Sequence, residues 1–202
     1  MSNRPEILDA IKEGKSNVHS LAKMPDLEGV FKRGAQEGPL LDLFIQSARQ
    51  QGADIAFSTD IPDKGKWISS MYPEAENILS AVAGEGLPSA LTDQSGRPDF
   101  RQVDLSIIRG AFGVAENGSI WVPESSLPMR VIPFICAHLI IVLDSKDLVA
   151  NMHEAYRRNA LADAPFGVFI AGPSKTADIE QSLVIGAQGP RSVMILLEKK
   201  NA

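Results

Sequence analysis

The chain has 202 residues, of which 44% are hydrophobic and 22% are charged, a composition typical of a globular protein that is long enough to bury a sizeable core. Its formal net charge of −5 at pH 7 argues against nucleic-acid binding, because contacts with a phosphate backbone need clustered lysines and arginines. The charged N-terminus and the lack of an apolar run of about 20 residues predict a cytoplasmic protein without a signal peptide or membrane span. The single cysteine, Cys136, predicts no internal disulfide, no structural zinc site and no intrinsic cofactor such as an iron–sulfur cluster. The three histidines lie in distant segments of the chain, so we predict no metal site.

The beginning of the chain stands apart from the rest. Glycines and prolines are scattered along the sequence, so no linker between independent domains is visible. A short helix is predicted from Pro5 to Lys12, with Gly14 at its end. We therefore predict an N-terminal helical appendage at residues 1–40, followed by one α/β domain at residues 41–202.

The predicted domain opens with a helix and a short strand. Apolar residues from Leu40 to Ala48 recur at helical spacing, and Gly52 ends the helix. A strand is predicted at residues 53–58. Glycines and prolines interrupt residues 60–98, which predicts short helices and loops, including a helix from Ala75 to Val82.

The second half of the chain contains five apolar runs that predict strands. These runs are Leu105 to Ile108, Gly113 to Val122, Ala137 to Leu143, Phe166 to Ala171 and Val193 to Leu197. Helical patterns at Asp144 to Arg158 and Thr176 to Gly186 separate the last three, which predicts a β-α-β-α-β unit with parallel strands. The pair Asn117-Gly118 inside the second run is typical of a tight hairpin turn. The predicted fold class is α/β.

A turn-rich segment follows the fourth predicted strand, with the sequence Gly172-Pro173-Ser174-Lys175-Thr176-Ala177-Asp178-Ile179-Glu180. If it lies at the carboxyl end of a parallel strand and begins a helix, its free backbone N–H groups attract anions. We predict that the ligand-binding residues here are Gly172, Ser174, Lys175, Thr176 and Asp178. The alternative is that Ser174 or Thr176 only caps the helix and that Asp178 only compensates its dipole. The glycines do not match a Walker A loop, which excludes a nucleoside-triphosphatase of that type.

A second candidate segment places Glu116 beside the predicted hairpin turn. A partly buried carboxylate on a rigid turn can act as a base or a nucleophile, so we predict Glu116 as the catalytic residue and Asn117, Gly118 and Ser119 as ligand contacts. The alternative is an ordinary hairpin with a solvated glutamate. Arg109 and Arg130 flank the hairpin and either pair with a substrate carboxylate or phosphate or form surface salt bridges.

Together these two segments resemble the lactate-utilization (LUD) family, formerly DUF162, and its bacterial lactate-utilization protein C type. Residues 113–119 are close to the family pattern G-[IV]-A-E-[TS]-G-[TS], and residues 172–180 are close to G-P-S-[RK]-T-A-D-I-E. Asn117 departs from the first pattern and makes Ala-Glu-Asn-Gly similar to the Ser-Glu-Asn-Gly motif of coenzyme A transferases, whose glutamate forms a thioester intermediate. Ala115 replaces the serine of that motif, and Trp121 stands where a glycine is expected.

The resemblance implies a NagB/RpiA/CoA-transferase-like fold, with a mostly parallel sheet flanked by helices and a hairpin insertion. It also implies an accessory subunit of a system that oxidises lactate to pyruvate, in which partner proteins hold the iron–sulfur clusters. Our leading hypothesis is that a small anionic ligand binds between the Glu116 turn and the segment from Gly172 to Glu180, attracted by Lys175. The alternative is a stand-alone enzyme that uses Glu116 as nucleophile or base on a thioester or sugar phosphate. A third hypothesis is a structural scaffold without chemistry.

Overall fold

The computed structural model describes Arg4 and residues 6–10, 39–82, 103–158, 165–176 and 184–199. The chain divides into two units, Met1–Ala35 and Gln36–Ala202. In the first unit, Arg4 and residues 6–10 are helical, as the sequence predicts. The predicted end of this helix, at Gly14, lies outside the described residues.

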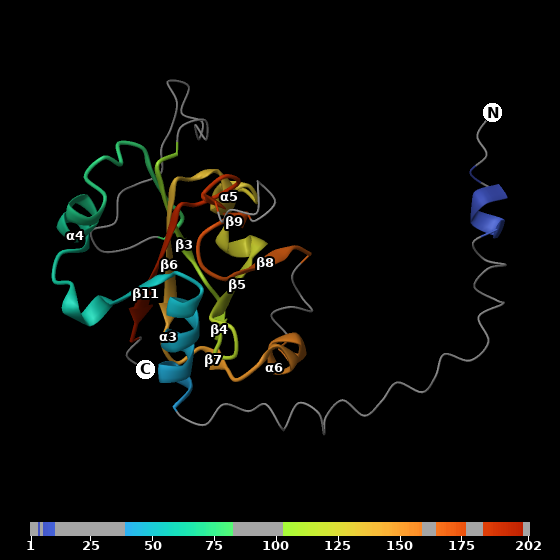
Figure 1. The fold of residues 1–202 in the computed structure, drawn as a ribbon, viewed down its shortest axis with the longest axis horizontal. Coiled ribbons are helices and arrows are strands. Elements are labelled where there is room, and N and C mark those ends of the chain that lie inside the picture. The colour runs from blue at the N-terminus through green and yellow to red at the C-terminus, as the bar shows by residue number, and fades with distance from the viewer. Residues whose placement is uncertain are drawn as a thin grey trace. The chain divides into compact units, whose positions relative to one another are not determined.

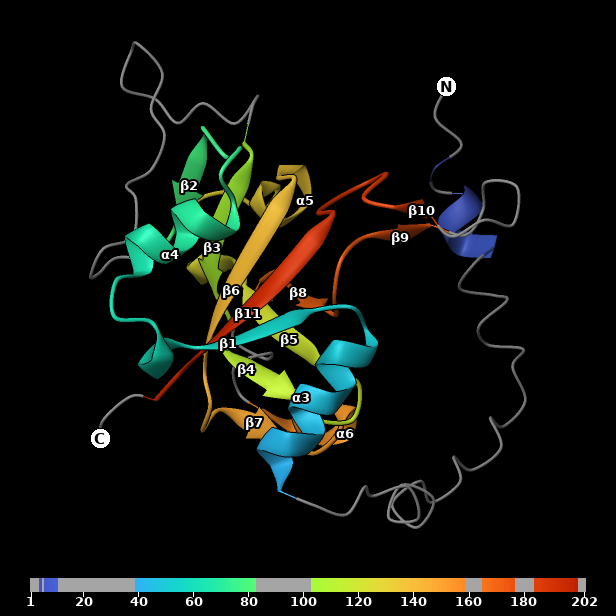
Figure 2. The ribbon, with the colours of Figure 1, turned by 60° about the vertical axis from the view of Figure 1, so that its left-hand side comes forward.

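A parallel sheet of five strands forms the centre of the second unit (Figure 2). In spatial order its strands are β1 (Asp54–Phe57), β11 (Ser192–Glu198), β6 (His138–Asp144), β3 (Leu105–Arg109) and β2 (Ile78–Ser80). Every neighbouring pair in this sheet is parallel. The central strands β6 and β11 are buried throughout their interiors, because layers cover both faces of the sheet, and this explains their unbroken apolar sequences. The predicted α/β class with a mostly parallel sheet is confirmed.

A second sheet lies beside the first. Its four strands, in spatial order, are β7 (Leu148–Val149), β4 (Phe112–Val114), β5 (Ser119–Pro123) and β8 (Gly167–Ile170). Strands β4 and β5 form an antiparallel hairpin, as the pair Asn117-Gly118 predicts. Viewed edge-on, the parallel sheet is a middle layer with α4 (Lys64–Met71) on one side and α3 (Leu40–Gln50) with the second sheet on the other (Figure 1).

Helix α3 begins after Pro39 and ends as the sequence predicts. Gly52 follows the helix with a φ of 86°, a left-handed conformation that glycine adopts without strain. The amide of Gly52 donates to the carbonyl of Arg49 at 2.9 Å, and the amide of Ala53 donates to the carbonyl of Ala48 at 3.0 Å. These two bonds form a Schellman motif, which turns the chain directly into β1.

Short helical turns complete the second unit. They are η2 (Ser58–Asp60), η3 (Glu124–Ser126), α5 (Ile132–Ile135) and α6 (Met152–Arg157). The two faces of the parallel sheet carry separate apolar clusters: Ile141 and Leu143 pack in the cluster that contains Phe44 of α3, whereas Ile140 and Val142 pack in the cluster that contains Ile68 of α4. Alternate residues of one strand therefore serve opposite layers.

The predicted helix from Ala75 to Val82 is wrong. Residues Ile78–Ser80 form strand β2, which extends the parallel sheet alongside β3. The carboxylate of Asp104 accepts hydrogen bonds from the amides of Glu76 and Asn77 at 3.1 and 2.8 Å and so holds the chain at the entrance to the strand. Pairing with the otherwise free edge of β3 overrides the local helical pattern, because tertiary contacts outweigh propensity.

The predicted β-α-β-α-β unit is wrong in its middle strand, in the first part of its first helix and at the described ends of its second helix. Strand β8 exists, but it pairs antiparallel with β5 in the second sheet. The first predicted helix contains strand β7 and is helical only at Met152–Arg157. At the second, Lys175–Thr176 and Val184–Ile185 form the antiparallel strands β9 and β10. Residues 177–183 lie outside the described residues.

Among the described residues, no helix is long and apolar enough to cross a membrane.

Candidate functional site

The turn that carries Glu116 joins β4 to β5 at the start of helix α6. The amide of Glu116 donates to the carbonyl of Ala150 at 3.0 Å. Its carboxylate accepts a hydrogen bond from the amide of Met152, the first residue of α6, at 2.9 Å. Glu116 is exposed, so it lacks the partial burial that its predicted role as a base requires. The observed contact places a negative charge at the positive end of a helix, which is a stabilising arrangement.

The three residues after Glu116 shape the turn and bring it against helix α3. The side-chain oxygen of Asn117 accepts hydrogen bonds from the amide and the hydroxyl of Ser119, at 3.0 and 2.7 Å. Gly118 has a φ of 70°, and a Cβ atom there would lie only 2.3 Å from the amide nitrogen of Ala48. The glycine is therefore required both by the conformation of the turn and by the close approach of α3.

The segment that begins at Gly172 does not lie where the sequence predicts. The amide of Ser174 donates to the carbonyl of Pro190, and the carbonyl of Ser174 accepts from the amide of Gly186, both at 2.9 Å. Pro190 directly precedes the short turn into β11, which begins at Ser192. The segment thus lies beside the amino ends of the parallel strands rather than their carboxyl ends. Lys175 and Thr176 are in strand β9, so the predicted helix does not begin at Thr176; anion binding by this segment stays a prediction.

Gly172 and Lys175 contact the end of helix α3. Gly172 has a φ of 69°, and a Cβ atom there would lie 2.2 Å from the carbonyl oxygen of Gln51. The ammonium group of Lys175 donates to the same carbonyl oxygen. A cation at the C-terminus of a helix is stabilised by the helix dipole, so this contact gives Lys175 a structural role. Asp178 lies outside the described residues.

Both predicted loops thus contact the C-terminal end of helix α3, but the charged groups of Glu116 and Lys175 are held at two different helices. Gly118 contacts Ala48 of α3 and Gly172 contacts Gln51, which directly follows α3, and Ala48 and Gln51 are separated by about one helical turn. The carboxylate of Glu116 is held at α6, and the ammonium group of Lys175 is held at Gln51.

A different group of charged side chains lies at the carboxyl edge of the parallel sheet. Arg109 ends β3, Glu198 ends β11 and Lys64 begins α4. The two terminal guanidinium nitrogens of Arg109 each lie 3.1 Å from Oε2 of Glu198, and Nζ of Lys64 lies 3.5 Å from Oε1. The exposed fractions of these side chains are 35%, 20% and 17%, in that order, so solvent screens these charges less than it screens surface ion pairs.

A cavity of about 460 Å³ lies next to Arg109. Its described lining comes from Ala81 and Val82, which follow β2, from Arg109, and from residues 125–128, which include the last two residues of η3 and the loop after it. Ligand sites of open α/β sheets form beyond the carboxyl ends of the strands, and they combine apolar walls with a few polar groups. This cavity has the first property, but Val82 and Leu127 are buried, so its walls offer little apolar surface.

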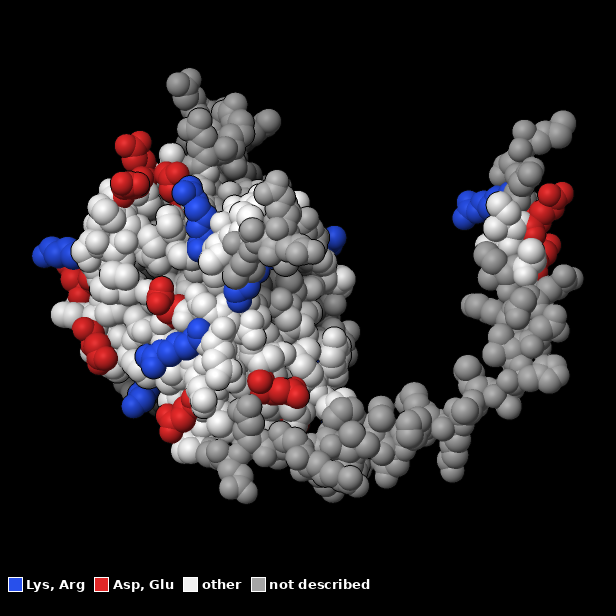
Figure 3. All heavy atoms as spheres, in the orientation of Figure 1, with Lys and Arg blue, Asp and Glu red and all other residues white. Residues whose placement is uncertain are grey.

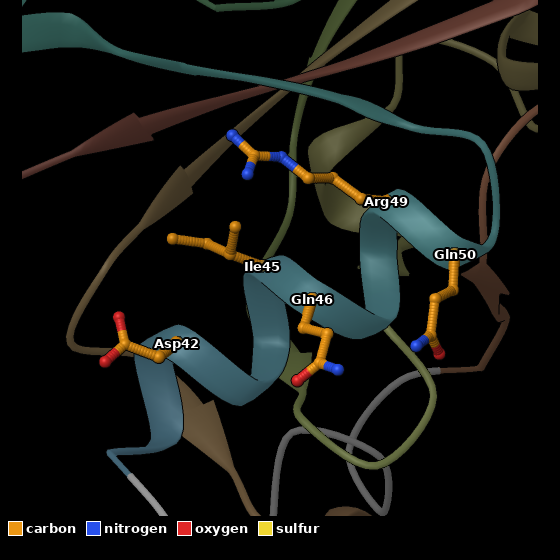
Figure 4. Close-up of a pocket in the computed structure, with 5 residues that line it drawn as sticks. All are labelled: Asp42, Ile45, Gln46, Arg49 and Gln50. Atoms are coloured by element: carbon orange, nitrogen blue, oxygen red, sulfur yellow. The ribbon is translucent and has the colours of Figure 1, made fainter.

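A second hollow of about 460 Å³ runs along the outward face of α3, where Asp42, Ile45, Gln46, Arg49 and Gln50 line it (Figure 4). These positions recur at helical spacing on the face opposite the buried residues Phe44, Ser47 and Ala48. The described part of this hollow is therefore the solvent face of a single helix, with one acidic and one basic side chain.

The amino edge of the parallel sheet holds a small polar cluster. Nδ1 of His138 lies 2.7 Å from Oγ of Ser192 on the neighbouring strand, and the ring of Tyr72 lies 5.0 Å from the imidazole ring. Burial, with the nearby charge of Arg191, lowers the pKa of His138, although Asp104 and Glu74 oppose the shift. Burial also raises the pKa of the Cys136 thiol, as is usual for a cysteine that packs as a small apolar residue.

Within the described ranges, no group of three or more histidine, cysteine, aspartate or glutamate side chains is arranged to hold a metal ion. Charges of both signs are interspersed on the face shown in Figure 3. That face carries no extended basic area of the kind that binds nucleic acid.

The parallel sheet, the second, mixed sheet and the cavity at the carboxyl edge define an α/β protein with a candidate ligand site. A family model, the LUD domain, matches residues 6–197. The chain therefore belongs to the LUD domain family. A crystal structure of a DUF162 family protein from Deinococcus radiodurans has a similar fold, with a TM-score of 0.52 and 17% sequence identity, over 79% of this chain and 96% of that one.

Two curated bacterial relatives are similar in sequence. A Neisseria meningitidis protein described as uncharacterized is 31% identical over 157 residues, which cover 66% of this chain and 67% of the relative. A lactate utilization protein C from Halalkalibacterium halodurans is 30% identical over 106 residues, which cover 49% of this chain and 46% of the relative. The matched region thus spans less than half the length of that second protein.

Of the residues at this edge, only Arg109 is a candidate in the sequence; Lys64, Glu198, Ser125 and Ser126 are not predicted from it. Glu198 follows an apolar strand, which is a recognisable signal because strand ends of a parallel sheet meet at one edge. Lys64 and the two serines are in segments without a motif, and only the packing of α4 and η3 around the sheet places them near this edge.

Proposed function

We propose that this chain acts in lactate utilization, as an accessory component that binds a small anionic ligand. The observation that carries the proposal is its similarity to several bacterial relatives named lactate utilization protein C. We further propose that it acts in the cytoplasm and that partner proteins supply any iron–sulfur clusters, because the sequence has only one cysteine and a cluster needs several.

The proposal is tested by deleting the gene and measuring lactate-dependent dye reduction in cell extracts. We expect reduction to be lost in the deletion strain and to return when the chain is supplied. Reduction that is the same in both strains would reject the lactate role.

The small anionic ligand is proposed to lie where the sequence hypothesis places it, near Glu116 and Lys175. Both side chains already have structural contacts, which count against this site: Glu116 binds the first amide of α6, and Lys175 binds a carbonyl at the end of α3. The variant Lys175→Met separates the two roles. Loss of a cation at the end of α3 should lower the free energy of unfolding by about 0.5 kcal/mol, whereas loss of a ligand contact should abolish anion binding and leave stability unchanged.

A stand-alone enzyme that uses Glu116 as its nucleophile remains the alternative function. The experiment is to incubate the protein with an acyl-CoA and to search by mass spectrometry for a covalent adduct on Glu116. Glu116→Gln provides the matched control, because the amide has the same size but cannot form the thioester. An unmodified wild-type protein would count against this alternative.

A further inference from the structure

Strand β8 forms one edge of the second sheet. It pairs with β5 on one side, and among the described strands none pairs with its other side. The amide of Glu124 donates to the carbonyl of Phe166 at 2.9 Å, so the even-numbered residues of β8 form the hydrogen-bonded pairs with β5. Because successive peptide groups alternate in direction along a strand, the amides of the odd-numbered residues point toward the open edge. These residues are Gly167, Phe169 and Ala171.

This edge lacks the features that usually prevent a strand from pairing with another chain, which are charged side chains, prolines and short length. From Phe166 to Gly172 the sequence is Phe-Gly-Val-Phe-Ile-Ala-Gly, and its flanking prolines, Pro165 and Pro173, lie outside this stretch. The other described edges are better protected. Strand β1 begins with the exposed Asp54, and β2 and β7 are only three and two residues long.

The open edge is complementary to itself. If two copies of β8 pair antiparallel across a two-fold axis at Phe169, the two Phe169 residues exchange both of their backbone hydrogen bonds. In the same register the amide of Ala171 donates to the carbonyl of Gly167 in the other copy, and Val168 lies opposite Ile170. Every cross-strand pair is then uncharged and apolar, so no like charges oppose each other, and aromatic and β-branched pairs stabilise antiparallel strands.

The side chain at the axis belongs to an aromatic cluster. The centroid of the Phe169 ring lies 4.8 Å from that of Trp121 and 6.1 Å from that of Tyr156, and Tyr156 is 67% exposed. Two residues of a hydrogen-bonded antiparallel pair have Cα atoms about 5.5 Å apart, with both side chains on the same face. The two Phe169 rings would therefore be neighbours and extend the cluster across the axis, which favours this register.

We propose that β8 is a dimerisation strand, through which two copies of this chain join their second sheets into one continuous sheet. The pairing uses neither Glu116 nor Lys175, so it is independent of the proposed function. Strand addition at a single edge makes a small interface, in which backbone hydrogen bonds supply much of the affinity. We therefore expect a dimer that dissociates on dilution.

The first test is analytical ultracentrifugation of the purified full-length chain at concentrations from about 1 μM to about 1 mM, the range that weak complexes require. We expect a reversible equilibrium between monomer and dimer. A monomer at every concentration overturns the proposal.

Hydrogen exchange, followed by NMR at both ends of this concentration range, locates the interface. The outward amides of Gly167, Phe169 and Ala171 should become protected as the dimer forms. The amides of Val168 and Ile170 already bond to β5 and should be protected at both concentrations. If the protein dimerises while the three outward amides exchange at an unchanged rate, the interface lies elsewhere and the assignment of β8 is overturned.

Charges placed at Phe169 test the two-fold axis. Phe169→Lys and Phe169→Glu each set like charges directly opposite one another in the dimer, and we expect each to weaken dimerisation at least tenfold. An equal mixture of the two variants should dimerise again, because opposite charges then meet at the axis. Circular dichroism and a urea titration establish that each variant is folded. If both are folded and their mixture stays monomeric, the register centred on Phe169 is overturned.

A variant outside the aromatic cluster tests the same edge. Ala171→Pro changes an exposed residue and removes one outward amide from each copy, so it should weaken the dimer even if the variants at Phe169 fail to fold. Ile185→Glu is the matched control, because it replaces an apolar residue of β10 that is 50% exposed; its dimerisation should equal that of the wild type. Wild-type dimerisation of Ala171→Pro, or loss of the dimer in the control, overturns the assignment.

Discussion

Gly118 is the residue on which the contact between the hairpin turn and helix α3 most depends. We predict that Gly118→Ala lowers the free energy of unfolding by roughly 2–4 kcal/mol, because the added methyl group combines backbone strain with overpacking against Ala48. A urea titration measures the change. The conservative control is Ser119→Ala, which removes one hydroxyl but no backbone contact. A loss in Gly118→Ala no larger than in this control would contradict the account of the turn.

The lowered pKa of His138 predicts that the stability of the folded protein depends on pH. Its pKa in the folded protein lies below the ordinary value of 6.5, so between these two values the unfolded chain binds more protons than the folded one. The free energy of unfolding therefore decreases as the pH falls through about 6.5. Urea titrations at about pH 7.5 and pH 5.5 measure this decrease, which should be smaller in His138→Gln than in the wild type. The same decrease in both proteins would show that other groups cause it.

Strand β2 shows how one side chain can control an element. The carboxylate of Asp104 accepts two backbone hydrogen bonds, from Glu76 and Asn77, immediately before the strand. We predict that Asp104→Ala costs about 1–2 kcal/mol, because it leaves these amides without their partner. Hydrogen exchange should accelerate at residues 78–80 more than in the central strand β6. Uniform acceleration in both strands would argue against a local role for Asp104.

The elements predicted correctly share one property, which is that local sequence suffices to specify them. Helix α3 has a regular apolar stripe and a glycine at its end, and the β4–β5 hairpin has the Asn-Gly pair. The elements predicted wrongly depend on distant partners. Strand β2 forms because β3 offers a free edge, and strand β9 forms because β10 pairs with it.

For the whole molecule, the division into two units predicts that the unit from Gln36 onward folds by itself. The described apolar clusters of this unit contain no residue before Leu41, so the described part of its core is built from this unit. We expect a variant that starts at Gln36 to show the same urea midpoint and the same cooperativity as the full chain. A lower midpoint in the shortened protein would assign a stabilising role to the first 35 residues.

The sequence by itself determined the fold class, the helix that opens the domain, the hairpin and the family. Each of these depends on local patterns: apolar runs, glycine at positions of positive φ, and two motifs of successive residues. Only the tertiary structure decided that β8 joins the second sheet, that Lys175 contacts the end of α3, and that Arg109 and Glu198 meet beside a cavity. The reason is physical, since strand pairing and the meeting of strand ends depend on contacts between residues far apart in the chain, which local patterns do not encode.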